Sequence, residues 1–333
     1  MRFVVVGAGA VGGVVGGLLD VAGFNVTLVA RGEHLTKIQQ AGLRLRTIDG
    51  EQLLPIRAVG SVAEVDWCAT GDPADPAGET VVLLAVKSDA TAGLLAELAA
   101  VAPPTIALAC LQNGVANEPL ALRWFERVYG ICVMAPTSHT EPGLVAADCG
   151  PVAAVLDIGR YPATEDVDPA AATIAAALER AGMLSQPRAD VMPAKYRKLL
   201  SNLGNAVDAA CARGEAATEL MRLARAEGEA VLTAAGIAVT SADDDTDRRG
   251  DLLRAYGPPG SRGGGSTWQS LARGTGAVET DYLNGEIVAV ARRSRQTAPV
   301  NELLQRTVAA LATERGRPRS LDAAALLTKL DRG

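Results

Sequence analysis

The N-terminal segment joins an apolar strand candidate to a glycine turn. The apolar run Phe3–Val6, mostly valine, leads directly into the pattern Gly7-x-Gly9-x-x-Gly12. β-branched residues favour strands, and glycines at this spacing are typical of a tight turn that opens a helix over a pyrophosphate. A second strand candidate follows at Asn25–Val29. The segment therefore predicts the first βαβ unit of a dinucleotide-binding fold.

Each glycine has its own role in such a turn. Gly7 allows the turn, Gly9 admits a pyrophosphate close to the backbone, and Gly12 allows the helix to pack tightly on the strand. The N–H groups at the start of the helix point at the phosphates. The residues expected to contact the cofactor here are Gly7, Ala8, Gly9, Ala10, Val11 and Gly12.

The same segment has a second interpretation, as a membrane helix. Phe3–Leu19 carries no charge, and Gly9 and Gly13 have the small-x-x-x-small spacing of transmembrane dimers. The run is shorter than the ~20 apolar residues that span a bilayer, and each interior glycine costs a helix about 1 kcal/mol relative to alanine. A signal peptide is also disfavoured, because its basic region would be Arg2 alone. We expect a cytoplasmic protein with no membrane partner.

Composition limits the classes of partner and site. A chain of 333 residues exceeds the usual size of one hydrophobic core, which favours two domains. The net charge of −6, with no basic block, disfavours nucleic acid and anionic membranes as partners. The cysteines are odd in number and lack C-x-x-C spacing, so neither a metal site nor a disulfide framework is expected. They are Cys68, Cys110, Cys132, Cys149 and Cys211.

Two kinds of pattern divide the chain. Before Pro162, short β-branched runs alternate with helical stretches, as in the parallel sheet of an α/β fold; after it, long helical patterns prevail. We predict an N-terminal Rossmann-type dinucleotide-binding domain over residues 1–189 and a mainly α-helical C-terminal domain over residues 190–333. The expected main strands are Arg2–Val6, Asn25–Val29, Thr80–Ala85, Thr105–Leu111 and Arg127–Val133.

Some segments depart from this alternation. Leu43–Arg46 and Ile56–Val59 are expected to form a small strand pair. The acidic run Asp243–Asp247 is interpreted as a solvated loop. Gly257–Gly265 is interpreted as a surface loop, because its glycines and prolines do not favour regular structure.

Position 31 bears on the choice of cofactor. The second strand of a dinucleotide fold usually ends in an acidic residue that binds the adenine-ribose hydroxyls. Here Arg31 stands at that place. A guanidinium pairs with a 2′-phosphate and stacks on adenine, whereas a carboxylate repels the phosphate. The sequence therefore favours NADP(H) over NAD(H).

Two further polar residues follow strand candidates, at the edge where a parallel sheet binds ligands. Lys87 follows the strand that ends at Ala85, where it could approach the cofactor phosphates or ribose. Asn113 follows the strand that ends at Leu111, where its amide could orient the nicotinamide or a catalytic group. The alternatives are a solvent-facing lysine and a plain Asn-Gly turn.

Lysine is rare in this chain, so the lysines that are present are candidates for chemistry. A desolvated ammonium can release its proton, whereas a guanidinium cannot. In the helix expected over Ala194–Ala212, Lys198, Asn202 and Asn205 share one face at spacings i, i+4 and i+7. Polar amides beside a core-facing stripe need a partner or a ligand, although a solvated polar face is the alternative. The lysines are Lys37, Lys87, Lys195, Lys198 and Lys329.

Two more polar segments lie in the C-terminal half. Ser266 and Thr267 form a hydroxyl pair, and an acidic segment from Glu279 to Gly285 begins the helix expected over Val278–Arg293. Acidic residues in a first helical turn are often only complements to the helix dipole. The acidic segment alone therefore does not indicate a site.

Taken together, these segments resemble the ketopantoate reductase family (2-dehydropantoate 2-reductase). The resemblance covers essentially the whole chain, with the segments in the right order. The Lys-x-x-x-Asn and Glu-x-Asp-Tyr-x-Asn-Gly patterns are far more specific than the glycine turn. The segments that carry it are the glycine turn, Gln112-Asn113-Gly114, Lys198 with Asn202, Ser266-Thr267, and Glu279-x-Asp281-Tyr282-Leu283-Asn284-Gly285.

The resemblance implies a two-domain NADPH enzyme that reduces a 2-oxo acid in a cleft between the domains. It implies that Lys198 is the general acid and that Glu279 is an acidic partner that positions it. It also implies that Asn202 binds the substrate hydroxyl, that a residue of the hydroxyl pair binds the carboxylate, and that Asn113 lies on the nicotinamide side. The substrate-binding candidates are then Asn202, Asn205, Ser266, Thr267 and Asn113.

Two positions depart from the family pattern. Family members often carry a second amide eight residues after the lysine, where this chain has Ala206, with Asn205 one position earlier. A methionine commonly follows the hydroxyl pair, where this chain has Trp268. Both positions face the substrate in the family, so the reaction type is expected to hold while the exact 2-oxo acid stays open.

A lysine acid also agrees with the chemistry. Reduction of a ketone needs a proton donor within roughly 3 Å of the carbonyl oxygen. Histidine is a frequent donor, but the chain has only His34 and His139. We expect His34 at the surface and His139 in a loop, which leaves Lys198 as the better candidate.

Other functions remain open on the same residues. The fold could serve a secondary-metabolism 2-oxo acid, or an opine- or glycerol-phosphate-type dehydrogenase. A phosphorylated substrate would need several cations, for which Lys195 and Arg197 are the close candidates. A non-catalytic NADPH-binding regulator is a third alternative, against which Lys198 and Glu279 argue. The sequence also leaves a homodimer open.

Overall fold

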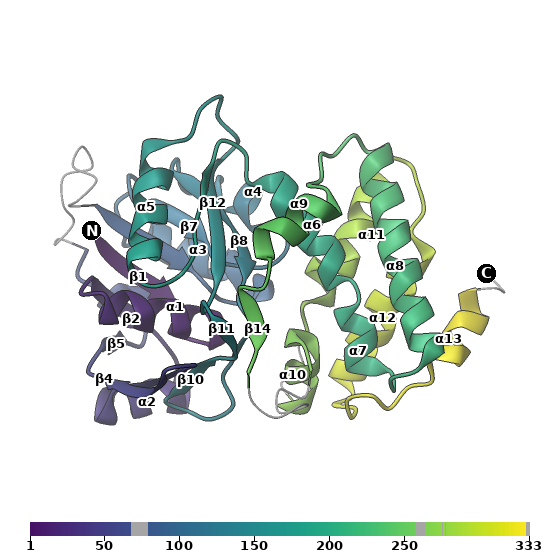
Figure 1. Cartoon of the computed structure of the whole chain (residues 1–333), viewed down its shortest axis with the longest axis horizontal. Coiled ribbons are helices and arrows are strands. Elements are labelled where there is room, and N and C mark those ends of the chain that lie inside the picture. Colours follow the sequence, from purple (N-terminus) through teal and green to yellow (C-terminus); the bar gives the residue numbers. More distant parts are fainter. Residues whose placement is uncertain (68–78, 257–263, 275, 277, 331–333) are drawn as a thin grey trace. The chain divides into compact units, whose positions relative to one another are not determined.

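The computed structural model of the chain describes residues 1–67, 79–256, 264–274, 276 and 278–330. These residues divide into two units, which Figure 1 shows coloured along the sequence. The first unit consists of Met1–Asn113, Asn117–Lys195 and Asp243–Gly257, and the second of Gly114–Ala116, Tyr196–Ala242 and Pro258–Gly333.

An eight-stranded sheet forms the centre of the first unit, with the strand order β13-β12-β8-β7-β6-β1-β2-β5. The valine-rich strand β1 pairs in parallel with β2 and with β6, and Val5 lies opposite Leu28 and Leu83. The other pairings are also parallel, except that β8 and β12 are antiparallel. The strands are β1 (Arg2–Val6), β2 (Asn25–Val29), β5 (Arg57–Val59), β6 (Thr80–Leu84), β7 (Ala107–Cys110), β8 (Val128–Met134), β12 (Val155–Tyr161) and β13 (Pro187–Arg188).

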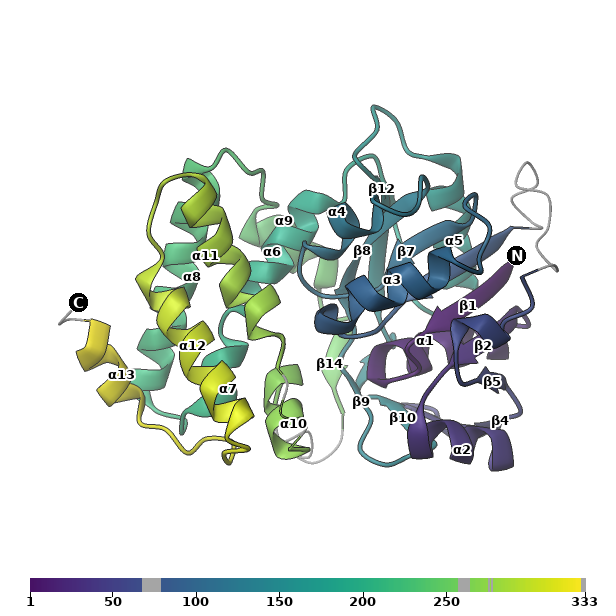
Figure 2. The ribbon, with the colours of Figure 1, turned by 180° about the vertical axis from the view of Figure 1, so that it is seen from behind.

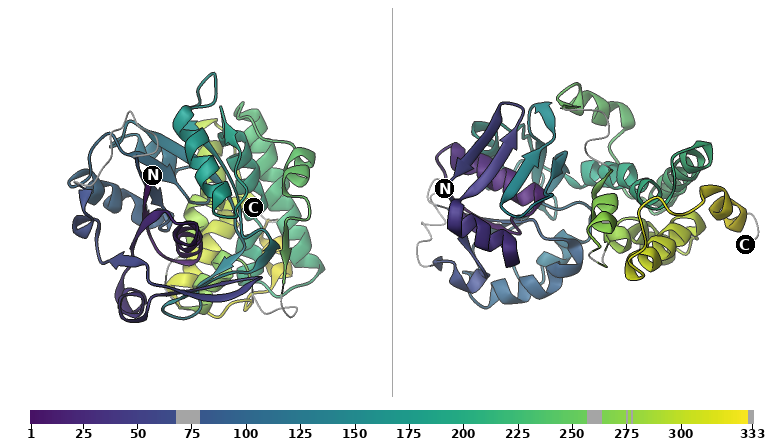
Figure 3. Two further views of the ribbon diagram at one scale, coloured as in Figure 1. Left: turned by 60° about the vertical axis from the view of Figure 1, so that its left-hand side comes forward. Right: turned by 90° about the horizontal axis from the view of Figure 1, so that it is seen from below.

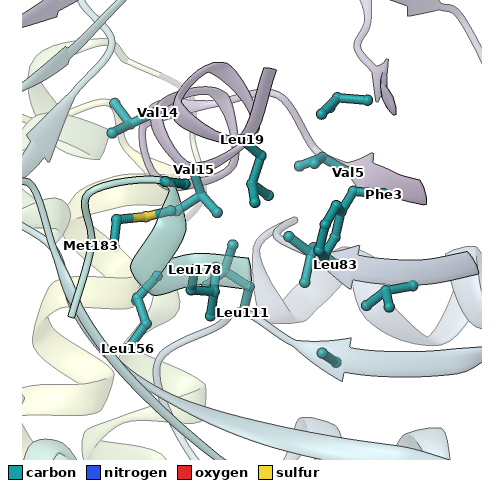
Figure 4. Close-up of a cluster of buried hydrophobic side chains, with 14 of the residues drawn as sticks. Phe3, Val5, Val14, Val15, Leu19, Leu83, Leu111, Leu156, Leu178 and Met183 are labelled. Carbon is teal, nitrogen blue, oxygen red and sulfur yellow. The ribbon is translucent and has the colours of Figure 1, made fainter. Parts of the chain in front are cut away.

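Helices cover both faces of this sheet, because alternate side chains of an apolar strand point to opposite sides. Phe3 and Val5 pack in one hydrophobic cluster with α1 and α5, as Figure 4 shows around Phe3. Val4 and Val6 pack in another cluster with α3. Figure 1 shows α5 in front of the sheet, and Figure 2 shows α3 on the opposite side. The helices are α1 (Ala10–Val21), α2 (Gly32–Ala41), α3 (Thr91–Ala99), α4 (Asn117–Ala121) and α5 (Pro169–Arg180).

A smaller sheet, with the order β4-β3-β10-β9, corrects the expected strand pair. Leu43–Arg46 does not pair with Ile56–Val59. Instead β3 pairs with β4, while β5 extends the main sheet beside β2. Gly50, with φ +124°, permits the tight turn between β3 and β4. The strands are β3 (Leu43–Thr47), β4 (Gly50–Leu54), β9 (Thr137–Ser138) and β10 (Leu144–Ala147).

The segment from Asp243 returns to the first unit, where it corrects a second expectation. The acidic run is not a loop but lies in α9 (Ala242–Arg249), which has acidic residues in its first turn and basic residues in its last turn. This distribution of charge complements the helix dipole. The helix is followed by β14 (Leu253–Ala255), which pairs with β11 (Cys149–Pro151). Most of the expected loop Gly257–Gly265 lies outside the described residues.

The described part of the second unit is built from helices, which Figure 3 shows in green to yellow. Helix α6 begins in the first unit and continues into the second. The helices are α6 (Met192–Asn202), α7 (Asn205–Ala210), α8 (Glu215–Ala234), α10 (Ser266–Ala272), the 3-10 helix η4 (Glu279–Tyr282), α11 (Asn284–Arg293), α12 (Pro299–Thr313) and α13 (Ala323–Leu330).

The predicted fold class is confirmed: a Rossmann-type α/β domain precedes a mainly α-helical domain. The proposed domain boundary between residues 189 and 190 stays a prediction. In the structure, the residues up to Lys195 and the segment from Asp243 belong to the first unit. Among the described residues, no helix is both long enough and apolar enough to cross a membrane.

Candidate functional site

The glycine turn has the geometry that its pattern predicts. Gly7 has φ +105°, and a Cβ there would lie 2.8 Å from the carbonyl carbon of Ala85. A Cβ on Gly12 would lie 2.2 Å from the oxygen of Gly7. Around Gly9, by contrast, an added Cβ would meet no described atom within 4 Å beyond Gly9 and its neighbours in the chain. The backbone at Gly9 is therefore open to a ligand, while Gly7 and Gly12 are closely packed.

The start of α1 suits an anion. Gly9 precedes the helix, and no described side chain caps its first N–H groups. The first turn of α1 also lacks an acidic residue. Uncapped N–H groups and the positive end of the helix dipole favour a phosphate at this position. The residues present therefore fit the pyrophosphate of a dinucleotide.

His34 is a residue that sequence reasoning misjudged. It is buried rather than at the surface, and its ring contacts the Ala8 carbonyl and the Gly143 N–H. His139 lies beside it, with ring centroids 4.2 Å apart. The expectation was wrong because the N–H of Gly143, 109 residues away in the sequence, donates to the ring of His34. The residues near His34 in the sequence do not indicate this contact.

Arg31 lies directly before α2, and the buried Ala30 separates it from the end of β2 at Val29. Its side chain is exposed, and its Nη2 is 3.9 Å from Oε2 of Glu97 on α3. An exposed ion pair of this length contributes little to stability. The guanidinium therefore stands at the carboxyl end of β2, where the adenine ribose binds in dinucleotide folds.

The segments after β6 and β7 are tied together by buried side chains. Gln112 Nε2 donates to the Val86 carbonyl over 2.8 Å and to Thr91 Oγ1 over 2.9 Å. Asn117 Nδ2 donates to Ser88 Oγ over 3.2 Å. Lys87 precedes the 3-10 helix η3 (Ser88–Ala90), and Asn113 follows Gln112. Both predicted cofactor residues thus lie in segments that these bonds hold.

The two cations considered for a phosphorylated substrate already have partners. Lys195 is buried and forms an ion pair with Glu118. Arg197 donates to the Thr240 carbonyl over 2.6 Å and to Glu229 over 2.8 Å. Binding a phosphate would require these bonds to break. Lys195 and Arg197 therefore do not support a glycerol-phosphate-type dehydrogenase, which would need such cations to bind the phosphate of its substrate.

Lys198 and Asn202 share a helix, but Asn205 does not. Helix α6 ends at Asn202 and α7 begins at Asn205, so the expectation of one face for all three is wrong. Just after the end of α6, the Leu203 carbonyl accepts a hydrogen bond from Asn284 Nδ2 over 3.2 Å. Lys198 is half-buried and Asn202 is buried, one turn apart on α6.

The hydroxyl pair opens α10. Ser266 is exposed, whereas Thr267 is 2 % exposed. Among the described residues, nothing forms a hydrogen bond with Oγ1 of Thr267. Since buried hydroxyls are normally satisfied, this oxygen is suited to a polar ligand or a water. Asp208 accepts a hydrogen bond from the Gly265 N–H over 3.3 Å, which attaches the start of α10 to α7.

The acidic segment does not open one long helix. The helix expected over Val278–Arg293 is divided at Leu283, where φ is −115° and ψ is −87°, into η4 and α11. Glu279 is half-buried at the start of η4. Asn284 starts α11 and is fully buried. In this motif, Glu279 therefore lies in the 3-10 helix, and the buried Asn284 begins the α-helix that follows.

Sequence reasoning missed the network behind Asn284. Its Nδ2 also donates to Oδ1 of Asn301 over 2.9 Å. Asn301 in turn donates to the Ala224 carbonyl over 3.0 Å and to Oε1 of Glu227 over 2.8 Å. Asn284 belongs to a recognisable motif, but no local pattern marks Asn301 or Glu227 as its partners.

The predicted site residues belong to different units. The glycine turn, Arg31, Lys87 and Asn113 lie in the first unit, and Lys198 and the other substrate candidates lie in the second. The described residues contain no group of three or more His, Cys, Asp or Glu side chains that could hold a metal ion. Of the five cysteines, the four that the structure describes are buried and are not joined in disulfides, and Cys68 lies outside it.

Two family models match the chain, and their descriptions agree. Residues 3–156 match the model "Ketopantoate reductase PanE/ApbA", and residues 190–312 match "Ketopantoate reductase PanE/ApbA C terminal". The 2-dehydropantoate 2-reductase of Halobacterium salinarum is 30% identical over 327 residues, which cover 90% of this chain and 95% of the relative. The enzyme of the same name from Archaeoglobus fulgidus is 27% identical, covering 86% and 90%.

Solved structures show the same fold. The PanE/ApbA family ketopantoate reductase from Ralstonia eutropha is 28% identical, with a TM-score of 0.77 over 95% of this chain and 99% of that chain. D-mandelate dehydrogenase, solved with NADH and anilino(oxo)acetate, also has a TM-score of 0.77 and the same coverage, at 20% identity. At that identity the likeness concerns the fold alone.

Proposed function

The chain belongs to the ketopantoate reductase family, and on that premise we propose that it catalyses the NADPH-dependent reduction of ketopantoate to pantoate. A closely similar branched 2-oxo acid is the alternative substrate of the same reaction. The relatives named 2-dehydropantoate 2-reductase support the oxidoreductase class and the substrate class. The residue roles below rest on this chain's own geometry and on its resemblance to the family.

One contact carries the proposal. Asn284, five residues after Glu279, donates through Nδ2 to the carbonyl of Leu203, which lies five residues after Lys198. The bond is buried, so solvent does not compete for it. It attaches the segment that carries the acidic residue to the end of the helix that carries the lysine. This attachment supports a shared role for Lys198 and Glu279.

The chemistry assigned to these residues is proton transfer and positioning. Bound NADPH supplies a hydride to the carbonyl carbon of the substrate. The ammonium of Lys198 donates a proton to the carbonyl oxygen as negative charge develops there, and the lysine regains a proton from solvent. The Glu279 carboxylate orients this ammonium. The products are the 2-hydroxy acid and the oxidised cofactor.

The second unit also supplies the substrate-binding groups that we propose. Asn202, one turn after Lys198, binds the substrate hydroxyl. The buried Oγ1 of Thr267, for which the described residues provide no partner, binds the carboxylate. Ser266 is exposed, which favours Thr267 over it. Asn205 starts a separate helix, so we assign it a smaller contribution to substrate binding than Asn202.

The first unit supplies the cofactor groups that we propose. The backbone from Gly7 to Gly12 holds the pyrophosphate, and Arg31 binds the 2′-phosphate. Lys87 approaches the phosphates or the ribose. Asn113 orients the nicotinamide from the end of β7. A positive side chain at the ribose position supports NADPH over NADH, although the mandelate dehydrogenase of the same fold was solved with NADH.

The test is the oxidation of NADPH, followed spectrophotometrically, on mixing with a panel of candidate substrates. The panel contains ketopantoate, 2-oxoisovalerate, pyruvate with and without an amino acid, and dihydroxyacetone phosphate. We expect the highest kcat/KM with ketopantoate, and a lower kcat/KM when NADH replaces NADPH. Faster turnover of pyruvate with an amino acid, or of the phosphate ester, would select one of the alternative dehydrogenases. NADPH binding without turnover of any compound would select the regulator.

A further inference from the structure

Lys195 and Glu118 form an ion pair inside the first unit, away from any assigned role. The lysine is 2 % exposed and the glutamate 0 %, and Nζ lies 2.8 Å from Oε1. Taking two charges out of water is costly, and an apolar pair of similar size is often equally stable. Stability alone therefore does not explain why this chain, with so few lysines, has one here.

The ammonium of Lys195 is close to three oxygen atoms. Besides its ion pair with the carboxylate, Nζ donates hydrogen bonds to the carbonyls of Gln112 and Ile131, each over 2.9 Å. The parallel pairing of β7 with β8 ends at Cys110 and Gly130. Lys195 thus joins the backbones of these two strands just beyond the point where their own hydrogen bonds end.

The surrounding backbone is fitted to this pair. A Cβ on Gly130 would lie 3.3 Å from Cδ of Lys195 and 3.3 Å from Oε1 of Glu118. Such distances are tighter than ordinary van der Waals contact. A glycine at this position of β8 therefore leaves the space that the lysine stem and the carboxylate occupy.

Lys195 contacts both ends of the segment 112–118. Its ammonium donates to the carbonyl of Gln112 at one end and forms the ion pair with the carboxylate of Glu118 at the other. Within the segment, Asn117 Nδ2 donates to the Asn113 carbonyl over 3.4 Å. The segment carries Asn113, the residue that the proposed function assigns to the nicotinamide.

We propose that Lys195 is a positioning residue for the reduction: by binding both ends of the segment 112–118, it holds Asn113 where hydride transfer requires it. This inference rests on the proposed role of Asn113.

Lys195→Met tests the proposal, because methionine keeps the length and removes the donor. We expect the backbone amides of residues 111–118 to exchange with deuterium faster than in the wild type. We expect kcat to fall about tenfold, since small misplacements of reacting groups cost large factors in rate. The Kd for NADPH should change much less than kcat, and the primary isotope effect with deuterated NADPH should rise as hydride transfer becomes slower.

A double variant separates positioning from stability. Lys195→Met leaves the Glu118 carboxylate buried and unpaired, which by itself can lower Tm. Lys195→Met with Glu118→Met removes both charges and should recover much of the Tm. The carbonyls of Gln112 and Ile131 still lack their donor, so the faster exchange and the lower kcat should persist. Recovery of wild-type kcat and exchange in the double variant would overturn the proposal.

Leu178→Ala is the matched control for destabilisation. Leu178 in α5 is fully buried, and it packs in the same hydrophobic cluster as Phe3 and Val5 of β1. This variant should lower Tm while leaving exchange in the segment 111–118 and kcat near the wild-type values. If the wild type does not reduce any 2-oxo acid, the proposed function fails, but deuterium exchange still decides whether Lys195 holds the loop. Unchanged exchange in Lys195→Met would refute the inference in either case.

Discussion

The imidazole Nε2 of His34 lies 2.7 Å from the carbonyl oxygen of Ala8, which attaches α2 to the middle of the glycine turn. On the other side of the ring, the Gly143 N–H donates to Nδ1 over 2.8 Å. Because Nδ1 accepts, the proton of the neutral ring is on Nε2 and is donated to Ala8. A second proton, on Nδ1, would face the Gly143 N–H and break this arrangement.

We predict that acid weakens the folded state through His34. Burial, the largest effect, lowers the pKa of His34 from its ordinary value of 6.5, and the bond to Ala8 partly opposes it. The folded state therefore binds this proton less tightly than the unfolded chain does. The stabilisation is fully present above about pH 6.5 and is lost as the pH falls through the lowered pKa of the folded state.

The measurement compares wild type with His34→Gln, because an amide can donate and accept like the neutral ring but does not titrate. Tm and the Kd for NADPH are followed from about pH 7.5 to about pH 5. As the pH falls, we expect Tm to decrease and the Kd for NADPH to increase more steeply in the wild type than in His34→Gln. His139→Gln, which alters the neighbouring ring, is the control. Parallel pH profiles of wild type and His34→Gln would contradict the prediction.

A second prediction concerns the choice between the two nicotinamide cofactors. Arg31→Asp should weaken NADPH binding by more than about tenfold, because a carboxylate repels the 2′-phosphate that the guanidinium pairs with. NADH binding should change much less, since it has no 2′-phosphate. Arg57→Asp is the control, because Arg57 begins β5 and is exposed. Equal losses for the two cofactors, measured by titration calorimetry, would show that Arg31 does not read the phosphate.

The regular elements of the first unit were accessible from sequence because local patterns determine them. Apolar β-branched runs predict β1 and β2 with the bounds that the structure gives. The partners of the smaller strands were not accessible in this way. Leu43–Thr47 pairs with β4 because Gly50 permits a tight turn between them, and local periodicity does not distinguish this partner from Ile56–Val59.

The candidate site shows the same division between local and distant causes. The spacing of Lys198 and Asn202 predicts their shared helix face. At the break before Asn205, the Leu203 carbonyl bonds Asn284, which is 81 residues away. The burial of His34 likewise depends on Gly143, 109 residues away. Such contacts form only when the chain has folded, so composition and periodicity do not reveal them.

The network around Asn301 yields a prediction about stability. Asn301 is fully buried and bonds Asn284, Glu227 and the Ala224 carbonyl. Asn301→Ala removes these three buried hydrogen bonds, which should lower the free energy of unfolding by about 2–4 kcal/mol. Urea unfolding measures this change. Thr313→Ala, an exposed position on the same helix, should cost less than about 1 kcal/mol. Similar losses in the two variants would show that the network contributes little.

The last prediction addresses the general acid. Lys198→Ala should lower kcat by about a hundredfold or more, because the developing alkoxide loses its proton donor. The Kd for NADPH should stay nearly unchanged, since the cofactor residues that we propose belong to the first unit. Lys329→Ala, at an exposed lysine of α13, is the control and should retain wild-type turnover. Steady-state kinetics with ketopantoate, together with NADPH titrations, give both quantities. Wild-type turnover in Lys198→Ala would exclude this lysine as the acid.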